Sequence, residues 1–262
     1  MKSRQSLHDR LTEQRGLIGL LQAHPHPTLT EIAGVSGYDF VMLDDEHGLF
    51  DHADYVQALQ VLSSTNALAF VRLASHDTHA LGRYLDLGAD VIVVPNVSTA
   101  EQARGLVRGM TYPPAGTRGV GASLHRATQY GRNNAAYLKA PRDGVGLLVI
   151  IESALGVSNV DDILAVEGVD GAIVGPADLS ADLGHPGDFS GADYADALAR
   201  VERAAALTGK VLGTAPHPGY PLDALVTRGH RILIVGSDVS LVGDAMRAQV
   251  ATANATLETN PR

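Results

Sequence analysis

The sequence contains no cysteine and no tryptophan among its 262 residues. The absence of cysteine excludes disulfides, thiolate catalysis and sites in which cysteine holds zinc or an iron–sulfur cluster. It fits a protein from a reducing compartment, so we expect a cytoplasmic location. The first apolar run, residues 17–21, is too short for a signal peptide or a membrane span.

The chain also lacks any block of like charges, although its net charge is −9. Nucleic acids and anionic membrane surfaces attract clustered basic residues, and the sequence offers no such cluster. It has no Gly-x-Gly-x-x-Gly after an apolar strand and no P-loop. We therefore expect no nucleic-acid or membrane partner and no NAD or ATP.

Lysine occurs only at Lys2, Lys139 and Lys210. Lys2 is terminal, Lys139 lies in a long connection, and Lys210 precedes a predicted strand instead of following one. A Schiff-base mechanism, and with it a PLP cofactor, is therefore not expected. Carbanion chemistry in this chain would then require a metal ion as the electron sink.

Eight short apolar runs alternate with longer amphipathic segments. The runs lack polar alternation, which predicts parallel strands that are buried on both faces. Eight such alternations over about 250 residues are typical of a (β/α)8 TIM barrel, an α/β fold, and we expect one domain over residues 1–262. The predicted strands are 17–21, 40–43, 67–72, 91–94, 147–151, 171–174, 211–214 and 232–235.

Helix signals lie between these runs. Ser98 to Glu101 resembles a capping box before a helix over 103–110, and the Ala-rich segment 188–207 ends near Gly209. Gly236-Ser237-Asp238 is expected to cap a helix beginning near Ser240, with a substrate contact as the alternative. The connection over about 111–146 is unusually long, and we expect it near the active-site mouth because such insertions are usually functional.

Two acidic residues follow consecutive predicted strands, Glu152 after the fifth and Asp178 after the sixth. The catalytic residues of these barrels lie at the carboxyl ends of the strands. Two carboxylates there, with water and a chelating substrate, suit Mg²⁺ or Mn²⁺; the alternative is a structural acid pair. The Gly175-Pro176 turn would let the N–H groups of Ala177 and Asp178 face a substrate anion.

Polar residues also follow the second, third and seventh strands. Asp44 is predicted to orient the imidazole of His47 as a general base, unless this is simply an acidic loop. Arg72 would stabilise a developing oxyanion or form a structural ion pair. His217, between two prolines, lies where a specificity loop is expected, although a stiff turn explains it equally.

These strand-end residues resemble the HpcH/HpaI aldolases, the class II, metal-dependent pyruvate aldolases. Residues 44–47 resemble the Asp-x-Glu-His segment of that family, and 112–121 resemble its Tyr-Pro-Pro…Arg-Gly-Val-Gly stretch. Residues 166–180, Val-Glu-Gly-Val-Asp-Gly through Gly-Pro-Ala-Asp-Leu-Ser, match its most specific signature. The resemblance runs from about Gly19 to Ala248, nearly the whole chain.

The resemblance implies a lyase that cleaves or forms 4-hydroxy-2-oxo acids, from pyruvate or a related 2-oxo acid and an aldehyde, through a metal-stabilised enolate. It implies Mg²⁺ or Mn²⁺, with Co²⁺ as a further candidate, held by Glu152 and Asp178. It also implies a homohexamer, a trimer of dimers, with the C-terminal helix swapped between subunits.

Individual roles follow from the same resemblance. Arg72 would contact the keto oxygen of pyruvate, and His47, oriented by Asp44, would move protons. Asp86 matches an acid that is contributed to the site of a neighbouring subunit. The substrate carboxylate would lie against the turn formed by Gly175, Pro176, Ala177 and Asp178.

The chain departs from the family pattern at several positions. Ile150 stands where many members have Gln, which puts one pyruvate contact in doubt, and Asp45 replaces a common Gly beside His47. Val120 and His217 are our candidates for choosing the aldehyde. The alternatives are a citrate lyase β-like lyase acting on acyl-CoA esters, which the lack of a basic patch disfavours, and a non-catalytic barrel that binds 2-oxo acids.

Overall fold

Eight parallel strands pair in chain order and close into a barrel through contact between β1 and β8. The computed structural model describes residues 5–12, 16–140, 142 and 144–259, so Lys2 lies outside the described residues. The closed barrel confirms the predicted (β/α)8 fold, with only small differences at the strand ends. The strands are β1 (Leu17–Gln22), β2 (Phe40–Asp44), β3 (Leu68–Arg72), β4 (Val91–Val94), β5 (Gly146–Ile151), β6 (Gly171–Val174), β7 (Val211–Thr214) and β8 (Ile232–Ser237).

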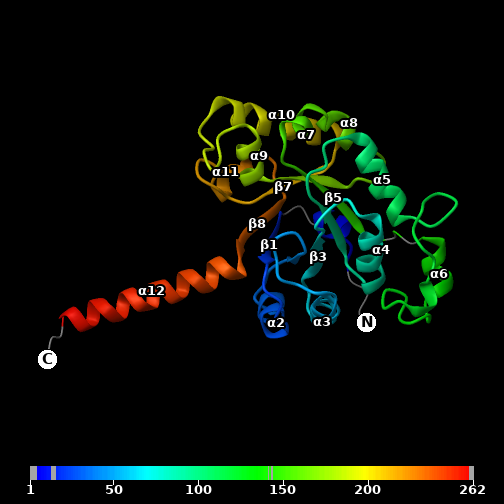
Figure 1. Cartoon of the computed structure of the whole chain (residues 1–262), viewed down its shortest axis with the longest axis horizontal. Coiled ribbons are helices and arrows are strands. Elements are labelled where there is room, and N and C mark those ends of the chain that lie inside the picture. The colour runs from blue at the N-terminus through cyan, green and yellow to red at the C-terminus, as the bar shows by residue number, and fades with distance from the viewer. Residues whose placement is uncertain (1–4, 13–15, 141, 143, 260–262) are drawn as a thin grey trace.

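Helices surround the strands on the outside of the barrel (Figure 1). They alternate with the strands, as a parallel sheet requires. The chain must cross back to the same end of the sheet before the next parallel strand can begin. The helices are α1 (Leu7–Thr12), α2 (Pro27–Val35), α3 (His52–Leu62), α4 (Thr78–Leu87), α5 (Ala100–Met110), the 3-10 helix η1 (Ala122–Leu124), α6 (Asn134–Lys139), α7 (Ala154–Ser158), α8 (Val160–Leu164), α9 (Pro176–Asp182), α10 (Ala192–Thr208), α11 (Leu222–Thr227) and α12 (Asp238–Thr259).

Three predicted helix starts differ from the structure, including that of α10, which begins at Ala192 and not at residue 188. The capping box of α5 is formed by Thr99 and Gln102, one residue later than expected, because Gln102 rather than Glu101 reaches back to the backbone of the cap. The C-terminal helix begins at Asp238, and the hydroxyl of Ser237 accepts the N–H of Ser240 at 3.1 Å. The end of α10 at Gly209, which adopts a left-handed conformation, agrees with the prediction.

A pair of stacked aromatic rings lies in the barrel interior. The rings of Phe40 and Phe70 lie 4.3 Å apart and nearly parallel. Gly19 of β1 permits this packing, because a Cβ there would overlap the Phe40 ring. These side chains belong to an interior cluster of buried residues that also contains Met42, Leu148 and Ile150. The interior is therefore a packed core and not a pore.

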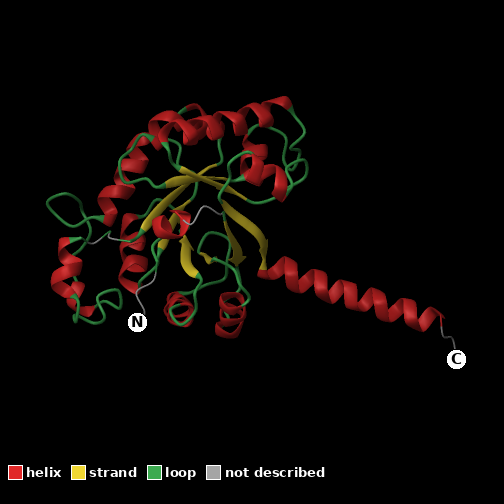
Figure 2. Ribbon diagram, turned by 180° about the vertical axis from the view of Figure 1, so that it is seen from behind, coloured by secondary structure: helices red, strands yellow, loops and turns green. Residues whose placement is uncertain are grey.

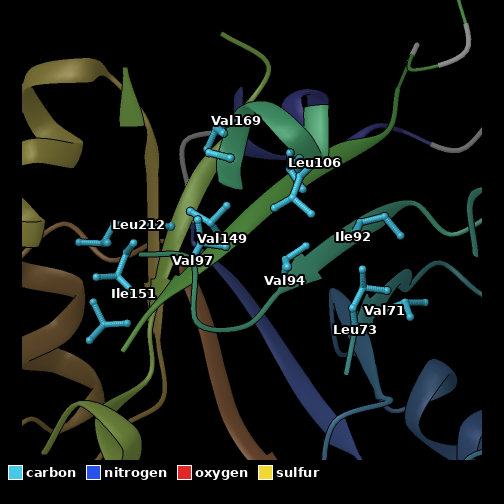
Figure 3. Packing of buried hydrophobic residues seen from close by; sticks show 14 of the residues in the cluster. Val71, Leu73, Ile92, Val94, Val97, Leu106, Val149, Ile151, Val169 and Leu212 are labelled. Atoms are coloured by element: carbon cyan, nitrogen blue, oxygen red, sulfur yellow. The ribbon is translucent and has the colours of Figure 1, made fainter. Parts of the chain in front are cut away.

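A second apolar cluster lies between the strands and the surrounding helices. Figure 3 shows side chains of β3, β4 and β5, including Val71, Ile92 and Val149, with Leu106 of α5 above them. Both faces of the strands are thus covered, which explains why the strand sequences read as continuous apolar runs.

The last helix does not pack along the barrel wall. α12 projects away from the barrel as a single long arm (Figures 1 and 2). Along it, the large apolar side chains are exposed: Val239, Leu241, Val242, Met246, Val250 and Leu257. None of the described helices is long and apolar enough to cross a membrane.

The long connection between α5 and β5 is anchored on the outer side of the barrel. Arg126 donates to the carbonyl of Leu87 at 3.0 Å, and the N–H of Ala127 donates to the carbonyl of Asp86 at 3.0 Å. α6 accordingly lies beyond α4 and α5 (Figure 1). Within one chain these contacts place the connection against α4, and its approach to an active-site mouth stays a prediction.

Candidate active site

The register of β2 and β3 places Asp44 beside Arg72 at the carboxyl end of both strands. Arg72 donates through Nε to Oδ1 of Asp44 at 2.8 Å and through Nη2 to Oδ2 at 2.7 Å. Asp44 is 1% exposed, and its charge is balanced by this two-point ion pair. The third guanidinium nitrogen, Nη1, lies 3.1 Å from Oε2 of Glu46.

His47 follows in the same loop, but Asp44 does not orient its ring. Among the described residues, the contact between the two is the backbone N–H of His47 donating to Oδ1 of Asp44 at 3.4 Å. The imidazole is instead 3.9 Å from Oε2 of Glu46, and its side chain is 67% exposed. The expected arrangement fails because Arg72 occupies both oxygens of Asp44.

Glu152 follows β5 and is 7% exposed. Its Oε1 accepts the backbone N–H of Asn96 at 2.6 Å. Its Oε2 lies against Gly175, where a Cβ would overlap it. Burial raises the pKa of Glu152 to about 7; the Asn96 N–H opposes this, while Asp178 and Glu46 raise it further. The charged form of Glu152 is therefore disfavoured here, chiefly because the carboxylate is buried and also because two acids lie near it.

Asp178 lies in the first turn of α9, which Gly175 precedes and Pro176 begins. The first N–H groups of a helix have no partner within it, so those of Ala177 and Asp178 are available to an anion. Within the described part of the chain, no side chain caps this helix. The turn therefore has the form that was predicted for a carboxylate-binding segment, and the binding of a carboxylate there stays a prediction.

The two sides of the mouth lie close enough to influence each other. Arg72 interacts electrostatically with Glu152, and Glu46 interacts with Asp178. The described residues contain no group of three or more His, Cys, Asp or Glu side chains that could hold a metal. Two carboxylates with uncompensated charge nevertheless fit a divalent ion whose remaining ligands are water and substrate. Glu152 and Asp178 would be its protein ligands.

Ile150 lies immediately below this site. It is 4% exposed, and its Cγ2 is 3.2 Å from the position that a Cβ on Gly175 would take. The surface beside Glu152 is therefore apolar at this point, where the family pattern would place an amide.

The structure does not bring Asp86 to these residues within one chain. Asp86 is on α4, where Oδ1 accepts Nη2 of Arg118 at 2.6 Å and lies 2.8 Å from Nδ1 of His125. Val120 is exposed, two residues beyond Arg118. Any part that Asp86 or Val120 plays at an active site would require a second copy of the chain.

His217 is held by its neighbours after β7. Its Nε2 is 2.8 Å from the hydroxyl of Tyr194, and its Nδ1 is 2.8 Å from the carbonyl of Ala215. Its ring stacks on Tyr220 with centroids 4.9 Å apart, and burial lowers its pKa. With both ring nitrogens engaged, His217 supports the β7–α11 turn, and contact with an aldehyde stays a prediction.

Sequence reasoning missed two residues of the site. Glu46 pairs with Arg72, and its presence in the Asp-x-Glu-His segment was a usable signal. Asn96, which contacts Glu152 through its backbone, carries a weaker signal, since Pro95-Asn96 directly after β4 indicates only a turn.

Comparisons with known proteins match the chain over most of its length. The model of the HpcH/HpaI aldolase/citrate lyase family matches residues 17–245. The chain is 40% identical to a hydroxypyruvate/pyruvate aldolase of Deinococcus radiodurans, over 91% of this chain and 86% of that protein. It is 35% identical to a 2-keto-3-deoxy-L-rhamnonate aldolase of Escherichia coli, over 93% and 91%.

A crystal structure of an HpcH/HpaI aldolase/citrate lyase family protein from Burkholderia cenocepacia is similar in fold. The TM-score is 0.87 at 31% sequence identity, and the match covers 92% of this chain and 95% of the other. The similarity thus extends over the whole barrel and is not confined to the strand-end motifs.

Proposed function

The chain belongs to the HpcH/HpaI aldolase/citrate lyase family and is an aldolase, a carbon–carbon lyase, and we propose that its substrates are 4-hydroxy-2-oxo acids. Cleavage would give pyruvate or a related 2-oxo acid, such as hydroxypyruvate, and an aldehyde; the reverse reaction would join them. The observation that carries this proposal is the buried Glu152 within electrostatic range of both Asp178 and Arg72 at one mouth.

Glu152 and Asp178 would hold a divalent ion, Mg²⁺ or Mn²⁺, with Co²⁺ as a further candidate. When bound, the ion supplies positive charge close to the keto and carboxylate oxygens of the 2-oxo acid, where negative charge develops. Burial is the main cause of the raised pKa of Glu152, with the charges of Asp178 and Glu46 adding to it, and a bound cation would offset both effects.

Arg72 would bind the keto oxygen through Nη1, the nitrogen that Asp44 does not use. Asp44 fixes the guanidinium plane, so the charge is in place before the reaction begins. Glu46, now 3.1 Å from Nη1, would move aside as substrate enters. The N–H groups of Ala177 and Asp178 would bind the substrate carboxylate and orient the chain of the 2-oxo acid.

His47 would accept the proton of the C4 hydroxyl during cleavage. The C3–C4 bond then breaks, and its electron pair passes to the 2-oxo acid fragment as an enolate. A proton returned to C3 completes the product, and the aldehyde leaves. The exposed imidazole beside Glu46 can exchange its proton with solvent between turnovers.

The direct experiment measures pyruvate release from 4-hydroxy-2-oxo acids by the protein loaded with Mn²⁺ or Mg²⁺. We expect turnover that disappears after exhaustive EDTA treatment and returns when the metal is restored. Full activity in the metal-free protein would contradict the metal role. An absence of release from every 4-hydroxy-2-oxo acid tried, with metal bound, would contradict the substrate class.

We further infer that α12 packs on a second copy of the chain, and that three such dimers form a hexamer. The projecting helix and its exposed apolar side chains support this, because burial of such a surface is the main favourable term in association. The same assembly would bring Asp86 to a neighbouring site. Light scattering tests the assembly: Met246→Glu should dissociate the hexamer, whereas the control Arg247→Glu should leave it intact. A hexamer unaffected by Met246→Glu would contradict the proposed packing of α12.

A further inference from the structure

We propose that Asn96 is the positioning residue for Glu152. Its backbone N–H holds Oε1, which leaves Oε2 as the oxygen that binds the metal ion. This inference rests on the proposed function, since it concerns how the candidate metal ligand is held. Asn96 does not touch the reacting atoms and acts through Glu152 alone.

The backbone of Asn96 has an unusual conformation. Its φ is +48°, and among the described residues that are not glycine only Gln129 and Tyr130 share a positive φ. This left-handed region is costly for most side chains, but asparagine tolerates it well. The turn directs the N–H at Oε1 of Glu152, at a distance of 2.6 Å. The sequence thus places a tolerant residue where the backbone must turn.

The second oxygen of Glu152 is confined from the other side. A Cβ at Gly175 would overlap Oε2, so only glycine leaves room for the carboxylate in this position. Gly175 directly precedes α9, which carries Asp178. The Asn96 N–H and the space left by the missing Cβ of Gly175 together hold the Glu152 carboxylate in one orientation, with Oε2 on the side of α9.

The loop that carries Asn96 is braced against the end of β5. The N–H of Val97 donates to the carbonyl of Ile150 at 3.1 Å, and the hydroxyls of Ser98 and Ser153 are 2.9 Å apart. Ser98 also donates to the side-chain oxygen of Asn96 at 3.1 Å. These contacts involve the residues on both sides of Glu152 in the sequence, so they hold the loop next to the ligand.

The test substitutes Asn96 and measures Mn²⁺ binding to the metal-free protein by electron paramagnetic resonance. Asn96 is exposed, so a new side chain meets little steric hindrance, and since the Val and Gly variants both lose the Ser98 contact, the difference between them reports the backbone preference. Asn96→Val disfavours the left-handed turn and should weaken Mn²⁺ affinity about 10- to 100-fold, the usual cost of losing an outer-shell partner. Asn96→Gly keeps the turn available and should bind within about threefold of the wild type.

Gln129→Val is the matched control, because Gln129 has φ +55° in the long connection, which contacts α4. It should lower stability without changing Mn²⁺ affinity. If Asn96→Val does not fold, Asn96→Ala replaces it, with a smaller loss in the same direction. Wild-type affinity in the folded Val or Ala variant would overturn the proposal, as would a Gly variant as weak as the Val variant.

Glu152→Gln separates the two levels of inference. Loss of Mn²⁺ binding in this variant, with wild-type binding in Asn96→Val, would reject the role of Asn96 and retain the metal site. Wild-type Mn²⁺ binding in Glu152→Gln would reject the metal site of the proposed function itself.

Discussion

Asp44 and Glu152 are both buried carboxylates at the barrel mouth, but their surroundings differ. Asp44, after β2, receives two hydrogen bonds from Arg72 and further ones from the N–H groups of Glu46 and His47. Glu152, after β5, receives one described hydrogen bond, from the Asn96 N–H, and faces a second acid. The β2–β3 side is therefore a closed ion pair, whereas the β5–β6 side carries charge that a ligand can neutralise.

This contrast separates two uses of a buried acid. A buried charge is costly unless it is paired, and removal of one partner leaves the other uncompensated. At Asp44 the partner is a side chain, so the acid serves to orient Arg72. At Glu152 the protein leaves the pairing incomplete, which is expected where a bound cation completes it.

Loss of either acid on the β5–β6 side should have the largest effect on catalysis. Glu152→Gln and Asp178→Asn should lower kcat/KM by more than about a thousandfold, beyond the roughly 10- to 100-fold expected of outer-shell changes. Calorimetric titration with Mn²⁺ should show that binding is lost. Glu167→Gln, an exposed acid at the opposite end of the barrel, is the control and should behave as wild type. Retained Mn²⁺ binding in either variant would remove the distinction between the two sides.

On the β2–β3 side, a change should affect catalysis without affecting the metal. Arg72→Lys keeps the charge but cannot bind Asp44 at two points, so kcat/KM should fall about 10²- to 10³-fold. Mn²⁺ affinity should stay near that of the wild type. Exchange of the methyl protons of pyruvate with solvent, followed by nuclear magnetic resonance, measures enolisation directly. A variant that exchanges normally, or that loses Mn²⁺ instead, would contradict the role given to Arg72.

The pH dependence of the metal-free protein tests the incomplete pairing. The pKa of Glu152 is about 7 in the folded protein, above its ordinary value of 4.5. Its contribution to stability is therefore complete below that ordinary value and is lost as pH rises through 7. Urea unfolding with EDTA should give a free energy about 2 kcal/mol lower at pH 8 than at pH 5.5 from this group.

Glu152→Gln isolates that contribution, because the amide does not titrate. The variant should lose less stability than the wild type between the two pH values. Saturating Mg²⁺ should restore the wild type at pH 8 but not the variant. An equal pH dependence in both proteins would show that Glu152 is not the group responsible.

The smallest expected effect concerns Ile150, the apolar neighbour of the open side. Ile150→Gln would restore the amide of the family pattern, and one hydrogen bond to a polar 2-oxo acid is worth about 2- to 10-fold in affinity. The ratio of kcat/KM for hydroxypyruvate over pyruvate as nucleophile should rise by that amount. Ile150→Leu, which keeps the apolar surface, is the control. An unchanged ratio would show that this position does not select the 2-oxo acid.

The sequence predicted the barrel well because its strands are buried on both faces. A continuous apolar run such as 147–151, with turn residues before and after it, is compatible with few structures other than a buried strand. A polar residue directly after such a run then lies at the barrel mouth. The positions of Glu152, Asp178 and Arg72 at strand ends followed from that rule.

The hydrogen-bond partners of the acids at the barrel mouth could not be predicted from the sequence. The spacing of Asp44 and His47 predicted a contact, but Arg72 competes for the same carboxylate from the adjacent strand. Asn96 contacts Glu152 through a backbone N–H, and such a contact leaves no side-chain pattern to read. Helix starts shifted for a similar reason, because Gln102 and Glu101 are both able to complete a capping box.

The interior cluster that includes the stacked rings of Phe40 and Phe70 packs the barrel beneath the mouth, so substrate would enter the proposed site from the mouth. In the proposed cleavage, the 2-oxo acid lies deepest, against Glu152 and Asp178, with the aldehyde outside it. The aldehyde must then depart first, and in synthesis the 2-oxo acid must arrive first. Pyruvate should accordingly inhibit cleavage competitively and the aldehyde noncompetitively, so that the packed barrel interior sets the kinetic order of the reaction.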